Sequence, residues 1–510
     1  MRISLIIILC LIGQFSIARF GEPLIGQEYS TSKKENFSGF LGETEFSVFT
    51  ADYIYYTKRK QELIIRKFHK SDLQLIDSKN IYTLVKEGFT NDPEEIFQHK
   101  GSLYLFSTMQ SDRDRTQLIS LEIFDESLER TSLTIVDSVK SDEINHIEIT
   151  EDKNGFVVAK HLKYTQLVEQ EIEMVRISNK GEIEWRKVIK SPMALQNIRI
   201  EQISFSSEGP MYYLCNYAFD ITTGDNSTSD QLVNNKYSLW AYDKETNFMK
   251  EFEIRLKGKW VNGVKMDMRS NNDLVISGFF NESKEQTVNG VFSLIINSKL
   301  EIVNTAWHKF DSDELAMFDK KDKKIKEIAD VKIKNLALMD DGSFYLLGEQ
   351  FFKYTERSYD PRTNVTTTTE HFNYNSIVAS YFDKRGNHVW TEHIPKYQNS
   401  TNDFGYFSSF ALLNSGEDIA LFFNDNEKNN LLENPSYKSY TSVFNNRKFQ
   451  ISYALINEEG LRDRGGLIDP KNNFILRAKM SGQINEDGIY LITETNRSSK
   501  LIKVPVKSKG

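Results

Sequence analysis

Short apolar stretches separated by polar turns recur along the whole chain. The clearest copy runs from Met339 to Gly348, where Asp341-Gly342 separates two apolar stretches. Asp-Gly is favoured in tight turns that need positive φ, so this pattern predicts a β-hairpin. The pattern recurs at Ala51-Asp52-Tyr53, Lys100-Gly101-Ser102, Asn154-Gly155-Phe156, Glu208-Gly209-Pro210, Asn272-Asp273-Leu274, Ser415-Gly416-Glu417 and Asp487-Gly488-Ile489. The sequence therefore predicts repeated copies of one hairpin.

A second pair of predicted strands follows each hairpin. In the clearest copy, the apolar stretch 376–382 precedes the turn 383–386 and a strand that contains Trp390. Four antiparallel strands in a repeat of about 40 to 50 residues or more are typical of a β-propeller blade. We predict one all-β domain, a β-propeller of four-stranded blades. Eight blades are favoured, with seven if one hairpin is an insertion, and a parallel β-helix is the rival architecture.

The two ends of the repeat region predict how the propeller closes. The last unit offers strands at 489–492 and 501–504 and lacks its outermost strand, whereas the N-terminal region has a spare strand at 24–29. Pairing of these segments would close the ring and remove exposed sheet edges.

The first residues have the pattern of a signal peptide. An apolar run from Ile3 to Ile12 is followed by Ser16-Ile17-Ala18, with small residues at the positions that a signal peptidase recognises. We predict a signal peptide over 1–18 and a propeller domain over 19–510. The apolar run is shorter than the ~20 residues of a membrane span. Cleavage would leave Cys215 as the one cysteine, without a partner for an intrachain disulfide.

Composition argues against one class of function. The net charge of −8 argues against nucleic-acid binding, which needs clustered Lys and Arg.

Catalytic and metal-binding patterns are missing from the sequence, so we predict no cofactor and no metal. The sequence leaves open whether the protein is an enzyme and favours a non-catalytic role. None of the eight histidines falls at His-x-x-x-His or His-Glu-x-x-His spacing. His388 and His393 flank Trp390 on a predicted outer strand, and we interpret one of them as solvent-facing and not as a metal ligand. The acidic segments 311–314 and 424–427 lack the glycine and spaced acids of a calcium loop, and we interpret them as solvated turns.

Two short segments partly match motifs of propeller enzymes. The segment 241–246 resembles the repeat of quinoprotein dehydrogenases, but Asn247 replaces the expected Gly and no other unit repeats the match. The segment 383–390 lies where sialidases have their Asp-containing turn, with a different spacing. We interpret it as a strand connection whose Trp390, like Trp185, packs between blades.

The same turn, Asp383 to Trp390, resembles turns in exported propeller-like repeat proteins of Bacteroidetes. That resemblance implies a periplasmic or cell-surface location and implies no chemistry. Surface cargo of the type 9 secretion pathway usually carries a separate C-terminal sorting domain, whereas this sequence ends inside its last unit. We therefore expect the periplasm.

Four long loops interrupt the predicted strands, at 217–236, 311–326, 350–375 and 424–448. Each connects the second and third strands of a unit or joins two units, and such connections share one face of a propeller. They carry the candidate partner-binding residues Tyr217, Phe219, Phe351, Phe352, Tyr354, Tyr359, Tyr374, Tyr437 and Tyr440. We expect a protein partner, such as an envelope or secretion complex, and a non-catalytic scaffold or subunit. The alternative is a glycan-binding or glycan-active protein with its site in the central channel.

Overall fold

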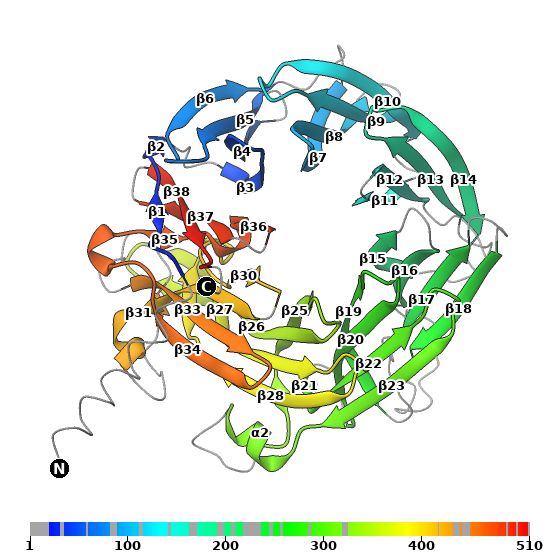
Figure 1. Cartoon of the computed structure of the whole chain (residues 1–510). Coiled ribbons are helices and arrows are strands. Elements are labelled where there is room, and N and C mark those ends of the chain that lie inside the picture. Colours follow the sequence, from blue (N-terminus) through cyan, green and yellow to red (C-terminus); the bar gives the residue numbers. More distant parts are fainter. Residues whose placement is uncertain are drawn as a thin grey trace, which may run out of the picture. The chain divides into compact units, whose positions relative to one another are not determined.

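The computed structural model is built almost entirely of antiparallel β-sheets (Figure 1). It describes residues 20–507 except 31–34, 58–59, 82–88, 112–115, 141–143, 153, 163–170, 191–197, 206–209, 218–235, 244–247, 255–258, 284–286, 319–324, 417, 432–438, 441–448, 486–487 and 496–497. The predicted signal peptide lies outside the described residues. Among the described helices, none combines the length and the apolar character that a membrane span requires.

Six sheets have four strands each, and in every one the strands pair in chain order. The first sheet comprises β3 (Glu35–Glu43), β4 (Ser47–Thr57), β5 (Lys60–His69) and β6 (Leu75–Asn80). The second comprises β7 (Phe89–His99), β8 (Ser102–Ser111), β9 (Thr116–Phe124) and β10 (Arg130–Lys140). The third sheet comprises β11 (Ile144–Asp152), β12 (Gly155–Leu162), β13 (Glu171–Ser178) and β14 (Ile183–Lys190). The fourth comprises β15 (Ile198–Phe205), β16 (Met211–Tyr217), β17 (Lys236–Asp243) and β18 (Phe248–Ile254). The fifth sheet comprises β19 (Trp260–Met268), β20 (Leu274–Asn281), β22 (Gly290–Ile296) and β23 (Ile302–Lys309). The sixth comprises β30 (Ala411–Asn414), β31 (Ile419–Asn426), β33 (Phe449–Asn457) and β34 (Gly460–Gly466).

Two further sheets have six strands each. One contains β25 (Val331–Leu338), β26 (Phe344–Asp360), β27 (Val365–Phe382), β28 (His388–Ile394), β29 (Gln398–Thr401) and β32 (Ser439–Tyr440). The other contains β1 (Leu24–Ile25), β2 (Tyr29–Ser30), β35 (Ile475–Leu476), β36 (Gly482–Asn485), β37 (Gly488–Glu494) and β38 (Ser498–Pro505). The smaller elements are the pair β21 (Thr287–Val288) and β24 (Ile328–Ala329), the helix α2 (Ser312–Ala316) and the 3₁₀ helices η2 (Glu427–Leu431), η4 (Pro470–Asn472) and η5 (Ala478–Met480). Successive four-stranded antiparallel units confirm the predicted fold class, an all-β β-propeller.

The described sheets fall into two compact units. The first unit is formed by Met1–Ile81, Glu349–Ala379 and Glu392–Gly510, as far as these are described, and the second by Tyr82–Gly348 and Ser380–Thr391. The strands β26 and β27 contribute residues to both units. Eight blades in one closed ring therefore stays a prediction.

Apolar cores between neighbouring sheets hold the second unit together. The middle strands β20 and β22 are buried along their whole length, whereas the outer strand β23 alternates between exposed and half-buried positions. This difference arises because a middle strand packs on both faces and reads as a continuous apolar run. In Figure 1 the first strands β7, β11, β15 and β19 lie at one edge of the row of sheets, and the fourth strands lie at the other.

The N-terminal segment supplies the fourth strand of the last sheet in the first unit. Leu24 pairs with Lys503 of β38, and Tyr29 pairs with Ser499. The Tyr29 ring is buried and packs on Phe68, with a centroid distance of 5.3 Å. The segment predicted at 24–29 thus pairs with the strand that the sequence assigned to it.

Several predicted turns lie where the sequence placed them, with Gly101, Gly342 and Gly416 at positive φ. The turn predicted at 51–53 is wrong, because these residues lie inside β4 and the preceding turn is at 45–46. Asp52 is buried there and forms an ion pair with Arg66 of β5. The predicted turn at 208–210 lies mostly outside the described residues.

Candidate functional site

The segment 350–375, predicted as a long loop, is a β-hairpin that extends one sheet. β26 and β27 have 17 and 18 residues, and the turn 361–364 joins them. The Asp360 carboxylate accepts hydrogen bonds from Arg362 N (2.9 Å) and Thr363 Oγ1 (3.1 Å) and so fixes the turn. We call residues 350–375 the hairpin extension.

Aromatic side chains line the hairpin extension. Phe352, Tyr354 and Tyr359 are 37%, 47% and 59% exposed. The Tyr354 ring stacks on His371 at 4.5 Å and lies 6.4 Å from the Phe352 ring, so three rings form one row. Offset contacts between rings hold such rows in place. Two of the predicted partner-binding residues, Phe352 and Tyr354, are therefore exposed and adjacent.

The other face of the hairpin extension is more buried. Phe351 packs on Tyr374 at 4.6 Å, and Tyr374 is buried at the base of the extension. Phe372 is also buried and contacts the exposed ring of Phe404 at 6.0 Å. Tyr374 therefore packs within the extension, and its role in a partner contact stays a prediction. Burial raises its pKa to about 12, with the nearby Glu349 carboxylate as the second cause.

The outer edge of β26 extends beyond its neighbour. Among the described strands β26 lies between β25 and β27. Because β26 has 17 residues and β25 has eight, at least nine residues of β26 extend past β25. An edge of this kind presents backbone N–H and C=O groups to another chain.

A buried polar network fixes the base of the hairpin extension. Lys396 Nζ donates to Glu349 Oε1 (2.7 Å), to the Tyr374 carbonyl oxygen (3.0 Å) and to Gln398 Oε1 (2.9 Å). Ser409 Oγ donates to Glu349 Oε2 at 2.8 Å. A network in which each member has a partner rigidifies its surroundings. The extension therefore emerges from a fixed base.

The other predicted partner-binding residues are less closely placed. Tyr440 is in β32, whose backbone pairs with β29 in the sheet that contains β27. Tyr217 ends β16 in the second unit, where its backbone pairs with Ile198 and Lys236. Phe219 and Tyr437 lie outside the described residues.

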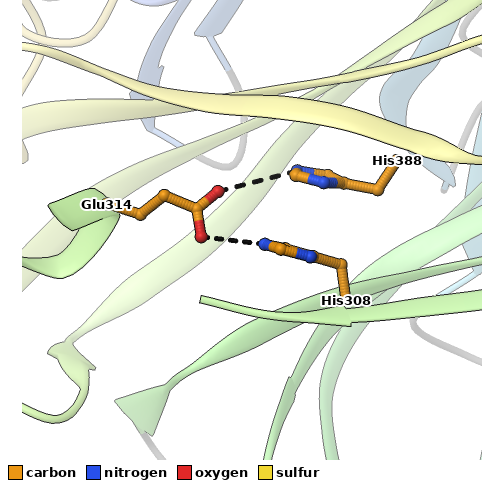
Figure 2. Close-up of side chains that lie close together, drawn as sticks. All are labelled: His308, Glu314 and His388. Atoms are coloured by element: carbon orange, nitrogen blue, oxygen red, sulfur yellow. Dashed lines mark hydrogen bonds and ion pairs between the residues drawn. The ribbon is translucent and has the colours of Figure 1, made fainter. Parts of the chain in front are cut away.

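The structure also assembles a cluster that the sequence did not indicate, formed by His308, Glu314 and His388 in the second unit (Figure 2). His308 Nε2 lies 2.8 Å from Glu314 Oε2, and His388 Nε2 lies 3.9 Å from Glu314 Oε1. The two imidazole rings are parallel within 8°, with centroids 3.9 Å apart. We call these three residues the histidine–glutamate cluster.

Burial sets the charge state in the histidine–glutamate cluster. The pKa of His388 is lowered to about 3, mainly by burial and secondly by the neighbouring His308. His388 is therefore neutral near pH 7, with one ring nitrogen free of a proton. Neutral imidazole is the form that binds metal ions.

The structure also places the polar residues that the sequence interpreted as solvent-facing or as turns. Of the two histidines that flank Trp390, His388 is not the solvent-facing one, since its side chain is 7% exposed. The segment 311–314 begins α2, in which Asp311 and Glu314 form a capping box. Asn424 and Asp425 are fully buried and not part of a solvated turn. The capping-box spacing was a sequence signal for the placement of Glu314, but nothing local relates His308 to His388, which follows 80 residues later.

Comparisons with known proteins show no family for this chain. No family model matches the chain, and no curated protein matches it. Similar solved structures include the polysaccharide lyase Uly1, 8% identical with a TM-score of 0.38, covering 84% of this chain and 91% of that one. Kluyveromyces lactis Hsv2 is 9% identical with a TM-score of 0.35, covering 85% of this chain and all of that one (100%). The WD40 domain of SCAP from fission yeast is 9% identical with a TM-score of 0.32, covering 95% of this chain and 98% of that one.

Proposed function

We propose that the protein is a non-catalytic β-propeller that binds a protein partner through its hairpin extension. The observation that carries this proposal is the outer edge of β26, where at least nine residues extend past the eight-residue β25. A sheet edge binds an extended segment through main-chain hydrogen bonds, and nearby side chains add specificity. A glycan has no repeating N–H and C=O groups, so the edge favours a protein as the partner.

The side chains of the hairpin extension suit such a contact. Phe352, Tyr354 and Tyr359 offer exposed aromatic area, which is enriched at protein interfaces. Charged residues alternate with them at Lys353, Glu356 and Arg357. Charges along a strand edge oppose unselective pairing between identical sheets. The edge therefore suits a chosen partner better than self-association.

The proposal places this contact outside the cytoplasm. The signal-peptide pattern at 1–18 and the resemblance of the turn at 383–390 to exported Bacteroidetes proteins support a periplasmic subunit of an envelope or secretion assembly. A rigid base for the hairpin extension supports a scaffold role, because preorganised surfaces lose less entropy on binding.

The test uses a defined probe, a phage-displayed library of random peptides, on the intact mature chain. The test variant replaces residues 353–372 with Asn-Gly, which shortens the hairpin and keeps Phe351 and Tyr374. The control variant carries Lys384→Ala and Arg385→Ala in the exposed turn between β27 and β28. We expect selected peptides that bind the intact chain and the control and lose binding to the shortened chain.

A second variant tests the aromatic row without changing the backbone. Phe352→Ser together with Tyr354→Ser should weaken the same peptides by about tenfold or more, since interface aromatics commonly contribute over 1 kcal/mol each. A glycan array is probed in parallel. Glycan binding that survives hairpin shortening, together with no hairpin-dependent peptide, would overturn the proposal in favour of a glycan-binding protein.

A further inference from the structure

The histidine–glutamate cluster has the donor atoms and the convergence of a metal site. His308 is the second-last residue of β23, Glu314 lies in α2 and His388 begins β28, so three separate elements each direct one side chain to the same point (Figure 2). Their ligand atoms all lie within 4.8 Å of one another. Zinc bonds to histidine nitrogen and carboxylate oxygen are about 2.0 to 2.2 Å long, so small side-chain rotations would bring all three atoms onto one ion.

The donor types select the kind of ion. Two imidazole nitrogens and one carboxylate suit Zn²⁺ and its neighbours among the divalent transition metals, whereas Ca²⁺ and Mg²⁺ prefer oxygen donors. Zinc sites with three protein ligands keep a fourth position for water or another ligand. The side chains of His308, Glu314 and His388 are 32%, 14% and 7% exposed, so the cluster is sheltered and still open to solvent on one side.

Hydrogen bonds within the capping box of α2 hold the Glu314 side chain in place. Glu314 Oε2 accepts from Asp311 N at 2.8 Å, and Asp311 Oδ1 accepts in return from Glu314 N at 2.9 Å. Hydrogen bonds of this kind orient metal ligands and raise affinity. Thr391 Oγ1 lies 2.8 Å from His388 Nε2 and also 2.8 Å from Ser380 Oγ, so an ion bound at Nε2 would replace the Thr391 contact while Thr391 keeps Ser380 as a partner.

We propose that His308, Glu314 and His388 bind one divalent transition-metal ion, with Zn²⁺ as the ion to test. The ion would join α2 to the outer strands of two neighbouring sheets, which also contact each other where Asn304 Nδ2 donates to the Arg385 carbonyl oxygen at 2.6 Å. An ion that binds only the folded state stabilises it. The bound ion would then fix the connection between β23 and β25 to the neighbouring strands.

The test measures zinc binding by the intact mature chain. Protein stripped with a chelator is titrated with Zn²⁺ in a calorimeter, and bound zinc is quantified after dialysis. We expect one zinc ion per chain at the site and an unfolding temperature that rises by a few degrees when Zn²⁺ is about 100 times its dissociation constant. His308→Ala and His388→Ala should each lower affinity at least tenfold.

Controls separate site binding from general effects. His69→Ala removes an exposed histidine of β5 and should leave the stoichiometry unchanged. Glu314→Gln keeps the side-chain size and an oxygen that accepts from Asp311 N, so it should weaken zinc binding without unfolding α2. This variant decides the outcome if His388→Ala fails to fold. Co²⁺ bound to the intact chain should give the visible absorption of a nitrogen- and oxygen-liganded site. Unchanged zinc stoichiometry in His308→Ala and Glu314→Gln would overturn the proposal.

Discussion

Lys396 Nζ donates to Glu349 Oε1 at 2.7 Å, and both side chains are completely buried. The remaining ammonium protons go to the Tyr374 carbonyl oxygen and to Gln398 Oε1, so all three donors of the lysine have acceptors. Burying two charges is costly unless each is paired and hydrogen-bonded. The pair therefore fixes the geometry where the hairpin extension begins.

Removal of one partner of this pair should be strongly destabilising. Lys396→Met leaves the Glu349 carboxylate buried without its cation, and we expect a loss of about 3 to 5 kcal/mol in the free energy of unfolding. Lys396→Met combined with Glu349→Leu should recover most of that loss, because apolar replacement of a buried pair is often close to neutral. Urea unfolding of the original protein, Lys396→Met, Glu349→Leu and the double variant measures both effects. A double variant as unstable as the two single losses added together would show that the residues act independently.

The N-terminal strand should contribute to the stability of the first unit. Deletion of residues 19–29 removes the partner of β38 and exposes its edge, so the unfolding transition should shift to lower urea concentration. Tyr29→Ala should alone cost about 3 kcal/mol, as truncation of a buried aromatic residue does. Ile25→Ala is the matched control, since Ile25 is exposed and its loss should cost well under 1 kcal/mol. Unchanged stability after deletion would contradict a structural role for the pairing.

The local pattern of apolar and polar residues is sufficient to predict the sheets but not the candidate sites. Middle strands such as β20 are apolar throughout because both faces are covered, and that signal is present in the sequence itself. The residues of the hairpin extension are mostly exposed, so no apolar alternation marks them as strands. The repeated hairpin pattern predicts a turn at Asp52, whereas the ion pair of Asp52 with Arg66 joins two paired strands and has no local signal. The histidine–glutamate cluster likewise depends on the packing of two sheets.

Trp185 and Trp307 occupy comparable outer strands and should differ in their contribution to stability. Trp185 is partly buried against the core shared by the sheets of β11–β14 and β15–β18, as the sequence predicted, whereas Trp307 is largely exposed. Trp390 instead packs on Tyr345 and Tyr381 of its own sheet. Trp185→Ala should cost about 2 kcal/mol, below the ~3 to 5 kcal/mol of a fully buried Trp. Trp307→Ala should cost about 1 kcal/mol or less, mainly through loss of the Lys259 contact at 4.2 Å. Equal losses would contradict this ranking.

Glu392 should make the stability of the first unit depend on pH. Burial raises the pKa of this carboxyl group, and the hydrogen bond that Leu461 N donates to its Oε2 (2.7 Å) lowers the pKa and offsets only part of that effect. A raised carboxyl pKa means that the folded state binds the proton more tightly than the unfolded chain. The contribution of Glu392 to stability is then greatest below the unfolded pKa and is lost as the pH rises through the folded pKa, by about 1.4 kcal/mol for each unit of difference.

Glu392→Gln removes this titration and keeps an oxygen that accepts from Leu461 N. Relative to the original protein, the variant should therefore gain stability between pH 4 and pH 7, as measured by urea unfolding at both values. Glu459→Gln, an exposed neighbour in the turn between β33 and β34, is the matched control and should show no such gain. If the Glu392→Gln variant instead loses stability relative to the original protein between pH 4 and pH 7, the ionised carboxylate is favoured at this position. The hydrogen bond from Leu461 N would then outweigh the cost of burying the charge.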